Sequence, residues 1–190
     1  MKNKTMYAIL GVLSLLGPMS GYDIKKFCDK SISYFWNENF GHLYPVLSQL
    51  EAAELIQRET SDDSSRRKSY TITEKGIAVL KNWLIEPVEY QPERSELLLK
   101  LSFGNQMELG DTVEMLRQAK ERTNAKYNQL SQILSYYLKN DEAKLKPQYP
   151  YWIVTLRYGI NSLGASIKWF DETEEYLINY QKKSGGEGAI

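Results

Sequence analysis

The sequence predicts a mainly α-helical protein with one small β-hairpin, and three observations support this fold class. Apolar residues recur at three- and four-residue intervals over most of the chain, which is the period of an amphipathic helix. Alternation of apolar and polar residues is confined to one stretch, residues 55–73, with turn-forming residues at its centre. A composition of 42% hydrophobic and 25% charged residues is that of an ordinary folded protein.

The first half of the chain predicts three helices, a β-hairpin and a fourth helix. Ser20 and Thr73 each precede an apolar-periodic segment, so we expect them to cap the helices that follow. Gly17 and Pro18 end the first helix, because neither residue favours a helix interior. The expected ranges are helices at 5–16, from 20 onward, at 41–53 and at 74–85, and strands at 55–60 and 67–73.

Two prolines divide the chain into two domains. Pro87 and Pro92 interrupt the helical pattern, because proline lacks the backbone donor that a helix interior needs. The end of the chain is rich in Gly, which is typical of a flexible tail. The expected organisation is a domain at 1–86, a linker at 87–92, a domain at 93–183 and a tail at 184–190.

The second domain predicts antiparallel helices that a second chain helps to cover. Apolar stripes with the spacing of packed helices run through residues 113–137 and 153–177. A short amphipathic helix is expected within 92–103, around Leu97, Leu98 and Leu101. The two long helices do not fully cover each other and this short helix, so we expect a homodimer. The residues expected at the dimer contact are Leu130, Leu134, Ile153, Leu156, Ile160, Leu163, Ile167 and Phe170.

Composition excludes several functional classes. One Cys and one His cannot build a cysteine-rich zinc site or a His-pair metal site. Neither a Gly-rich phosphate loop nor a nucleophile motif is present, so we expect no catalysis, cofactor or metal. The apolar run behind Lys2 and Lys4 lacks a clear cleavage site and is too short to span a bilayer. It predicts a buried helix in a cytoplasmic protein that does not contact membranes.

Three helices followed by a hairpin form a winged helix-turn-helix, which presents its third helix to the major groove of DNA. The segments 41–51 (GHLYPVLSQLE) and 67–76 (RKSYTITEKG) resemble the signature of the PadR family of bacterial transcription regulators. Phe35-Trp36 resembles the longer, AphA-like subgroup with a helical C-terminal domain. The resemblance implies a winged-helix DNA-binding domain at 1–86 and a helical dimerisation domain at 93–183.

The chain departs from the family pattern at one helix end. Family members usually have a glycine before the first strand of the hairpin, where this chain has Ala53-Glu54-Leu55. We therefore expect the end of the third helix to be reshaped. The hairpin tip also lacks the glycine or proline that is common there.

The third helix and the hairpin carry most of the residues expected to contact DNA. Gln and Ser side chains can bind base edges, whereas Tyr, His and basic side chains more often hold phosphates. The expected contacts are Lys25, Lys26, His42, Tyr44, Ser48, Gln49, Arg66, Arg67, Lys68 and Tyr70. Structural alternatives stay open: His42 can cap its helix, Tyr44 can belong to the core, and 66–68 can be a solvated turn. Glu51 is expected to pair within its domain, because a carboxylate repels phosphate.

We interpret the chain as a homodimeric transcriptional regulator of double-stranded DNA. It is expected to act as a repressor at a palindromic operator and to be released by a small aromatic ligand. The 14 Tyr and 4 Trp supply aromatic surface, and Trp36, Trp152 and Trp169 are the expected ligand pocket. Two alternatives remain: a small-molecule sensor, and a winged helix that binds protein without reading DNA.

Overall fold

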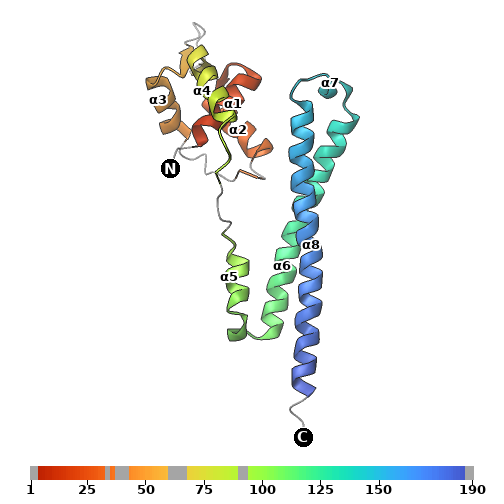
Figure 1. Cartoon of the computed structure of the whole chain (residues 1–190). Coiled ribbons are helices and arrows are strands. Elements are labelled where there is room, and N and C mark those ends of the chain that lie inside the picture. Colours follow the sequence, from red (N-terminus) through yellow and green to blue (C-terminus); the bar gives the residue numbers. More distant parts are fainter. Residues whose placement is uncertain (1–3, 33–34, 37–42, 60–67, 90–93, 187–190) are drawn as a thin grey trace. The chain divides into compact units, whose positions relative to one another are not determined.

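The chain forms two compact units, Met1–Gln91 and Pro92–Ile190. The computed structural model describes residues 4–32, 35–36, 43–59, 68–89 and 94–186. Both units consist mainly of helices (Figure 1), and the first also holds a small antiparallel sheet. The predicted fold class, mainly α with a small β component, is confirmed.

The first unit follows the predicted order of helices and strands. Its elements are α1 (Thr5–Leu16), β1 (Met19–Ser20), α2 (Gly21–Ser31), α3 (Leu43–Ala52), β2 (Ile56–Glu59), β3 (Ser69–Ile72) and α4 (Glu74–Leu84). Helix α1, which is the apolar run behind Lys2 and Lys4, contacts α2, α3, α4 and β3 and buries Ile9 completely. Both predicted caps are confirmed: the Ser20 hydroxyl accepts a hydrogen bond from the Asp23 amide, and the Thr73 hydroxyl accepts one from the Gly76 amide.

The sheet contains a third strand that the sequence pattern does not predict. Strand β1 pairs antiparallel with β3, so the strand order is β1-β3-β2 rather than a two-stranded hairpin. Two residues are too few to show an alternating pattern, which is why β1 leaves no signal in the sequence. The pairing of Ser20 with Ser69 places the start of α2 beside the hairpin.

A set of backbone contacts, which we call the α3–α4 joint, links Glu54 and Leu55 to Thr73 and Gly76. The Thr73 amide donates to the Leu55 carbonyl at 3.1 Å, and its hydroxyl donates to the Glu54 carbonyl at 2.8 Å. Gly76 lies so close to the Leu55 carbonyl that a Cβ atom there would be 2.1 Å from the oxygen. The Thr-Glu-Lys-Gly segment therefore fastens α4 to the chain between α3 and β2.

The glycine that is missing from the end of α3 has a backbone consequence. Glu54 has a φ of 61°, in the left-handed region where a Cβ atom is costly. Its side chain forms an exposed ion pair with Lys75, at 3.2 Å, and such a pair stabilises little. A glutamate thus holds the conformation that glycine adopts most readily.

The second unit is an antiparallel pair of long helices with shorter helices beside it. Its elements are α5 (Glu96–Ser102), η2 (Gly104–Gln106), α6 (Leu109–Lys139), α7 (Asp141–Lys144) and α8 (Tyr149–Gly186). Arg117 of α6 binds Glu174 of α8 at 2.6 Å, and Lys120 binds Asp171, so the contacts advance in opposite directions along the two helices. Lys120 and Glu174, which are charged residues within the two apolar stripes, therefore form ion pairs between α6 and α8.

Half of the residues predicted at the dimer contact are buried within the single chain. These are Leu130, Ile153, Leu156 and Phe170, and the partly buried remainder are Leu134, Ile160, Leu163 and Ile167. The reason is that α6 and α8 pack against each other along their length, so their stripes cover each other more fully than expected. Helix α8 also continues to Gly186, into the segment predicted as a tail.

We predict that Glu54→Gly raises the free energy of unfolding of the first unit by about 1 kcal/mol. Glycine removes the cost of a left-handed residue, which is about 1–2 kcal/mol, and part of this gain is lost because glycine orders less readily. Urea unfolding measures the change. Glu54→Gln is the control, because it removes the ion pair with Lys75 and keeps the Cβ atom; equal stability of the two variants would contradict the prediction.

Candidate nucleic-acid interface

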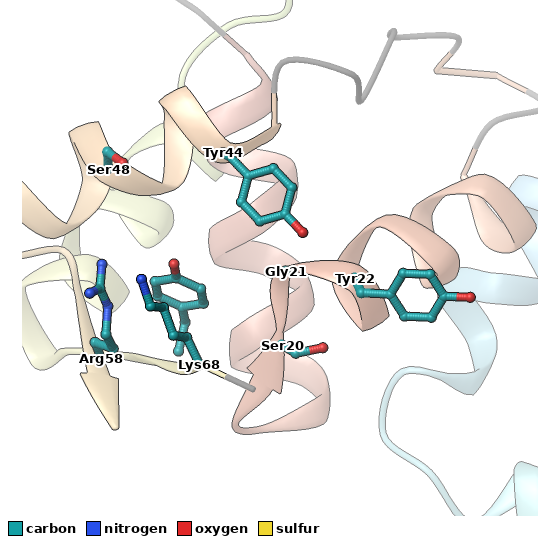
Figure 2. A pocket seen from close by; sticks show the side chains of 8 residues that line it. Ser20, Gly21, Tyr22, Tyr44, Ser48, Arg58 and Lys68 are labelled. Atoms are coloured by element: carbon teal, nitrogen blue, oxygen red, sulfur yellow. The ribbon is translucent and has the colours of Figure 1, made fainter. Parts of the chain in front are cut away.

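An open cleft of about 480 Å³ lies between α3, the start of α2 and the hairpin. Its lining residues come from three segments far apart in the sequence: Ser20, Gly21, Tyr22, Tyr44, Ser48, Arg58, Lys68 and Tyr70. Figure 2 shows the side chains of Arg58 and Lys68 rising from the hairpin toward α3, which carries Tyr44 and Ser48. Four of the predicted DNA contacts, Tyr44, Ser48, Lys68 and Tyr70, therefore meet in one cleft.

Helix α3 divides into a buried and an exposed face. Leu43, Val46, Leu47 and Leu50 are buried in the core, whereas Tyr44, Ser48 and Gln49 are exposed. Tyr44 is 60% exposed, so most of its side chain is open to solvent. Its ring lies beside Gly21, where a Cβ atom would be 3.0 Å from the Tyr44 Cε1 atom.

The hairpin contributes a cation that the sequence analysis misses. Arg58 of β2 pairs in register with Tyr70 of β3, and its guanidinium lies 5.9 Å from the centre of the Tyr70 ring. Its Nη2 atom also binds the Glu51 carboxylate of α3 at 2.8 Å. The prediction that Glu51 pairs within its domain is thus confirmed. Strand register could have identified Arg58, because it lies opposite a predicted site residue.

Three further predicted contacts, Gln49, Lys25 and Lys26, are described by the structure and do not line the cleft. Gln49 is exposed on α3 but does not line the cleft. Lys25 donates to Asp29 at 2.6 Å, and this hydrogen bond raises the Lys25 pKa. Lys26 is exposed on α2. The predicted contacts His42, Arg66 and Arg67 lie outside the described residues.

Two of the three tryptophans predicted to form a ligand pocket, Trp152 and Trp169, lie far apart along one helix. Trp152 and Trp169 both lie on α8, 169 − 152 = 17 positions apart, which is about 25 Å along a helix. Each instead contacts a neighbouring aromatic ring: Trp152 that of Tyr137 and Trp169 that of Phe170. Trp36 in the first unit has a buried indole N–H without a partner among the described residues.

The one cysteine of the chain, Cys28, is buried. Burial raises the pKa of the Cys28 thiol to about 11, so this residue stays protonated at neutral pH. His, Cys, Asp and Glu side chains form no metal-binding group of three or more in the part of the chain that the structure describes. No helix in those ranges is long and apolar enough to cross a membrane.

Two family descriptions match the chain in succession. Residues 9–82 match "Transcriptional regulator PadR-like family", and residues 93–177 match "Virulence activator alpha C-term". The chain belongs to the PadR-like family of transcriptional regulators. As a PadR-like protein it is a DNA-binding regulator and not an enzyme, and its first unit is a winged helix. The resemblance to the longer subgroup of the family is confirmed.

Relatives and solved structures agree with this assignment. The negative transcriptional regulator PadR of Bacillus subtilis is 29% identical over 128 residues, which cover 65% of this chain and 69% of that protein. The structure of that protein with operator DNA is similar to this chain with a TM-score of 0.78 at 23% sequence identity, over 91% of this chain and 98% of that one. Its structure with p-coumaric acid is similar with a TM-score of 0.73 at 25% identity, over 90% of this chain and 97% of that one. The structure of the Vibrio cholerae virulence activator AphA is similar with a TM-score of 0.73 at 26% identity, over 92% of this chain and 98% of that one.

We predict that Gln49→Ala weakens binding to the best operator by about 1–3 kcal/mol, because that is the value of a bidentate Gln–adenine contact. Binding to random-sequence DNA changes far less. Fluorescence anisotropy with both duplexes measures the difference. Gln132→Ala, at an exposed position of α6, is the matched control and leaves both affinities unchanged. An equal loss on both duplexes would contradict base reading by Gln49.

Proposed function

We propose that this PadR-like regulator is a cytoplasmic homodimer that represses transcription from a palindromic operator and is released by a small aromatic ligand. The observation that carries the proposal is the cleft, in which the exposed face of α3 and the basic side of the hairpin meet. The name of the Bacillus subtilis relative, a negative regulator, supports repression. A DNA-binding regulator acts where the chromosome is, which supports the cytoplasm.

The proposed reading of DNA follows from the exposed face of α3. A recognition helix enters the major groove with its outward side chains toward the base edges. Ser48 and Gln49 supply hydrogen-bonding groups for that role, and His42 is a further candidate at the start of the helix. Lys68 with Arg66 and Arg67 would hold phosphates near the hairpin, and Lys25 and Lys26 would do so from α2. Two copies of α3 related by a dimer axis imply a palindrome.

Apolar residues that the single chain leaves exposed are the proposed dimer surface. Leu98 and Leu99 of α5 are exposed, and no residue of that leucine-rich helix is buried. Tyr151, Val154 and Tyr158 of α8 are also exposed and follow a helical spacing that places them on one face. Exposed apolar side chains that gather on one face of a helix are typical of a protein–protein interface.

Trp36 supports the proposed ligand response. A buried indole N–H normally has a hydrogen-bond acceptor, and the Trp36 Nε1 atom has none among the described residues. The Bacillus subtilis PadR structure with p-coumaric acid supports an aromatic acid as the ligand. The ligand oxygen would supply the missing acceptor.

A mobility-shift assay with the DNA upstream of the chain's own gene tests the proposed function. We expect a discrete complex at concentrations where random DNA stays free, and release of that DNA by p-coumaric acid or a related phenolic acid. Equal binding of promoter and random DNA would overturn the operator proposal. Tight promoter binding that no phenolic acid reverses would overturn the ligand response alone.

We predict that Leu98→Ser combined with Leu99→Ser converts the dimer into a monomer that keeps its helical content. Both side chains would lose apolar contact with the second chain, at about 25 cal/mol per Å² of buried apolar surface. Light scattering measures the mass. Leu145→Ser is the control, because Leu145 is 86% exposed and lies outside the proposed surface. A double variant that remains dimeric would exclude α5 from the contact.

A further inference from the structure

The position of the cleft between α3 and the hairpin suggests what it holds. In a winged helix bound to DNA, the recognition helix enters the major groove, and the basic hairpin follows the phosphates or enters the adjacent minor groove. The sugar–phosphate strand that separates the two grooves must then pass between these elements. We propose that the cleft seats one phosphodiester of this strand, bound by Arg58, Lys68 and the Tyr70 hydroxyl. The proposal rests on the proposed docking of α3 in the major groove.

Arg58 is held in place before any ligand arrives. Its Nη2 atom binds Glu51 of α3 at 2.8 Å, and its guanidinium lies 5.9 Å from the Tyr70 ring centre. A guanidinium has five N–H donors, so the ion pair with Glu51 leaves donors for a phosphate oxygen. Fixing the side chain in the free protein reduces the entropy that is lost when DNA binds.

Tyr70 is a buried side chain with an uncommitted hydroxyl. Only 6% of the residue is exposed, yet it lines the cleft. Its ring contacts Arg58, but its hydroxyl has no hydrogen-bond partner among the described residues. The hydroxyl is not one of the buried polar atoms that lack a partner. Because the residue lines the cleft, a phosphate oxygen there would accept its proton.

The charges around the cleft favour an anion. Two cations, Arg58 and Lys68, belong to its lining, and none of the described lining residues is a carboxylate. The carboxylates close to it already have partners: Glu51 binds Arg58, and Asp23 accepts a hydrogen bond from the Ser20 hydroxyl. Lys68 is exposed and has no carboxylate partner in the described ranges, so its charge is available to a phosphate.

The test uses the full-length chain and a short labelled duplex of arbitrary sequence, because phosphate contacts are independent of sequence. Affinity is measured by anisotropy over a series of KCl concentrations. Arg58→Gln is expected to weaken binding and to reduce the slope of log K against log salt by about 0.9. Tyr70→Phe is expected to weaken binding about tenfold without changing that slope, since a hydrogen bond to a charged group is lost.

Matched variants separate the loss of a cleft contact from the effect of removing any exposed charge or hydroxyl. Lys81→Gln removes an exposed charge of α4 and Tyr176→Phe removes an exposed hydroxyl of α8, and neither residue lines the cleft. Both should bind like the wild type. Tyr70→Phe should also keep the wild-type melting temperature, because its hydroxyl binds no described residue. Wild-type affinity in both Arg58→Gln and Tyr70→Phe would overturn the proposal and leave DNA binding itself intact.

A second measurement identifies the source of the phosphate group. NMR spectra of the chain with labelled tyrosine rings are recorded with inorganic phosphate and with p-coumaric acid in place of the duplex. Suppose that phosphate shifts the Tyr70 signal, that Arg58→Gln abolishes this shift, and that the chain does not bind the duplex. This result would support the anion site and refute the proposed function. A shift with p-coumaric acid alone would make the cleft an aromatic-acid site and overturn the phosphodiester proposal. No shift with phosphate and no duplex binding would also overturn it.

Discussion

The winged helix depends on a close backbone contact at the α3–α4 joint. Gly76 approaches the Leu55 carbonyl so closely that no larger residue fits without movement. The same carbonyl accepts the Thr73 amide, whose residue also caps α4. Leu55 directly precedes β2, and Thr73 directly follows β3. The joint therefore fixes both strands of the hairpin relative to α3.

The geometry of the candidate DNA-binding surface depends on the α3–α4 joint. Arg58 lies on β2 and Glu51 on α3, so their ion pair forms only if the hairpin keeps its place beside the helix. Register across the strands then brings Tyr70 beneath the guanidinium. In the second unit, by contrast, ion pairs such as Arg117–Glu174 lie between two long helices of one chain. In each unit, ion pairs thus connect two secondary-structure elements and fix their relative position.

The sequence predicts the local structure well because local signals determine it. Ser20 and Thr73 are capping residues at helix starts, and Gly17 ends α1 where expected. Strand β1 and the role of Arg58 depend on tertiary pairing, which leaves no period in the sequence. The dimer contact stays a prediction, because an apolar stripe such as Ile153–Leu156, which is buried within this chain, has the same pattern whether it packs within a chain or between chains.

The free energy of unfolding of Gly76→Ala tests the central role of the joint most directly. Helix propensity and the clash with the Leu55 carbonyl change this free energy in opposite directions. Helix propensity alone would make alanine more stable by about 1 kcal/mol, and Gly11→Ala in α1, where a Cβ atom meets nothing within 4 Å, should show that gain. At Gly76 the clash with the Leu55 carbonyl should dominate and lower the free energy of unfolding by about 2 kcal/mol. Urea unfolding with hydrogen exchange of the first unit measures both variants. A Gly76→Ala protein as stable as Gly11→Ala would contradict the account.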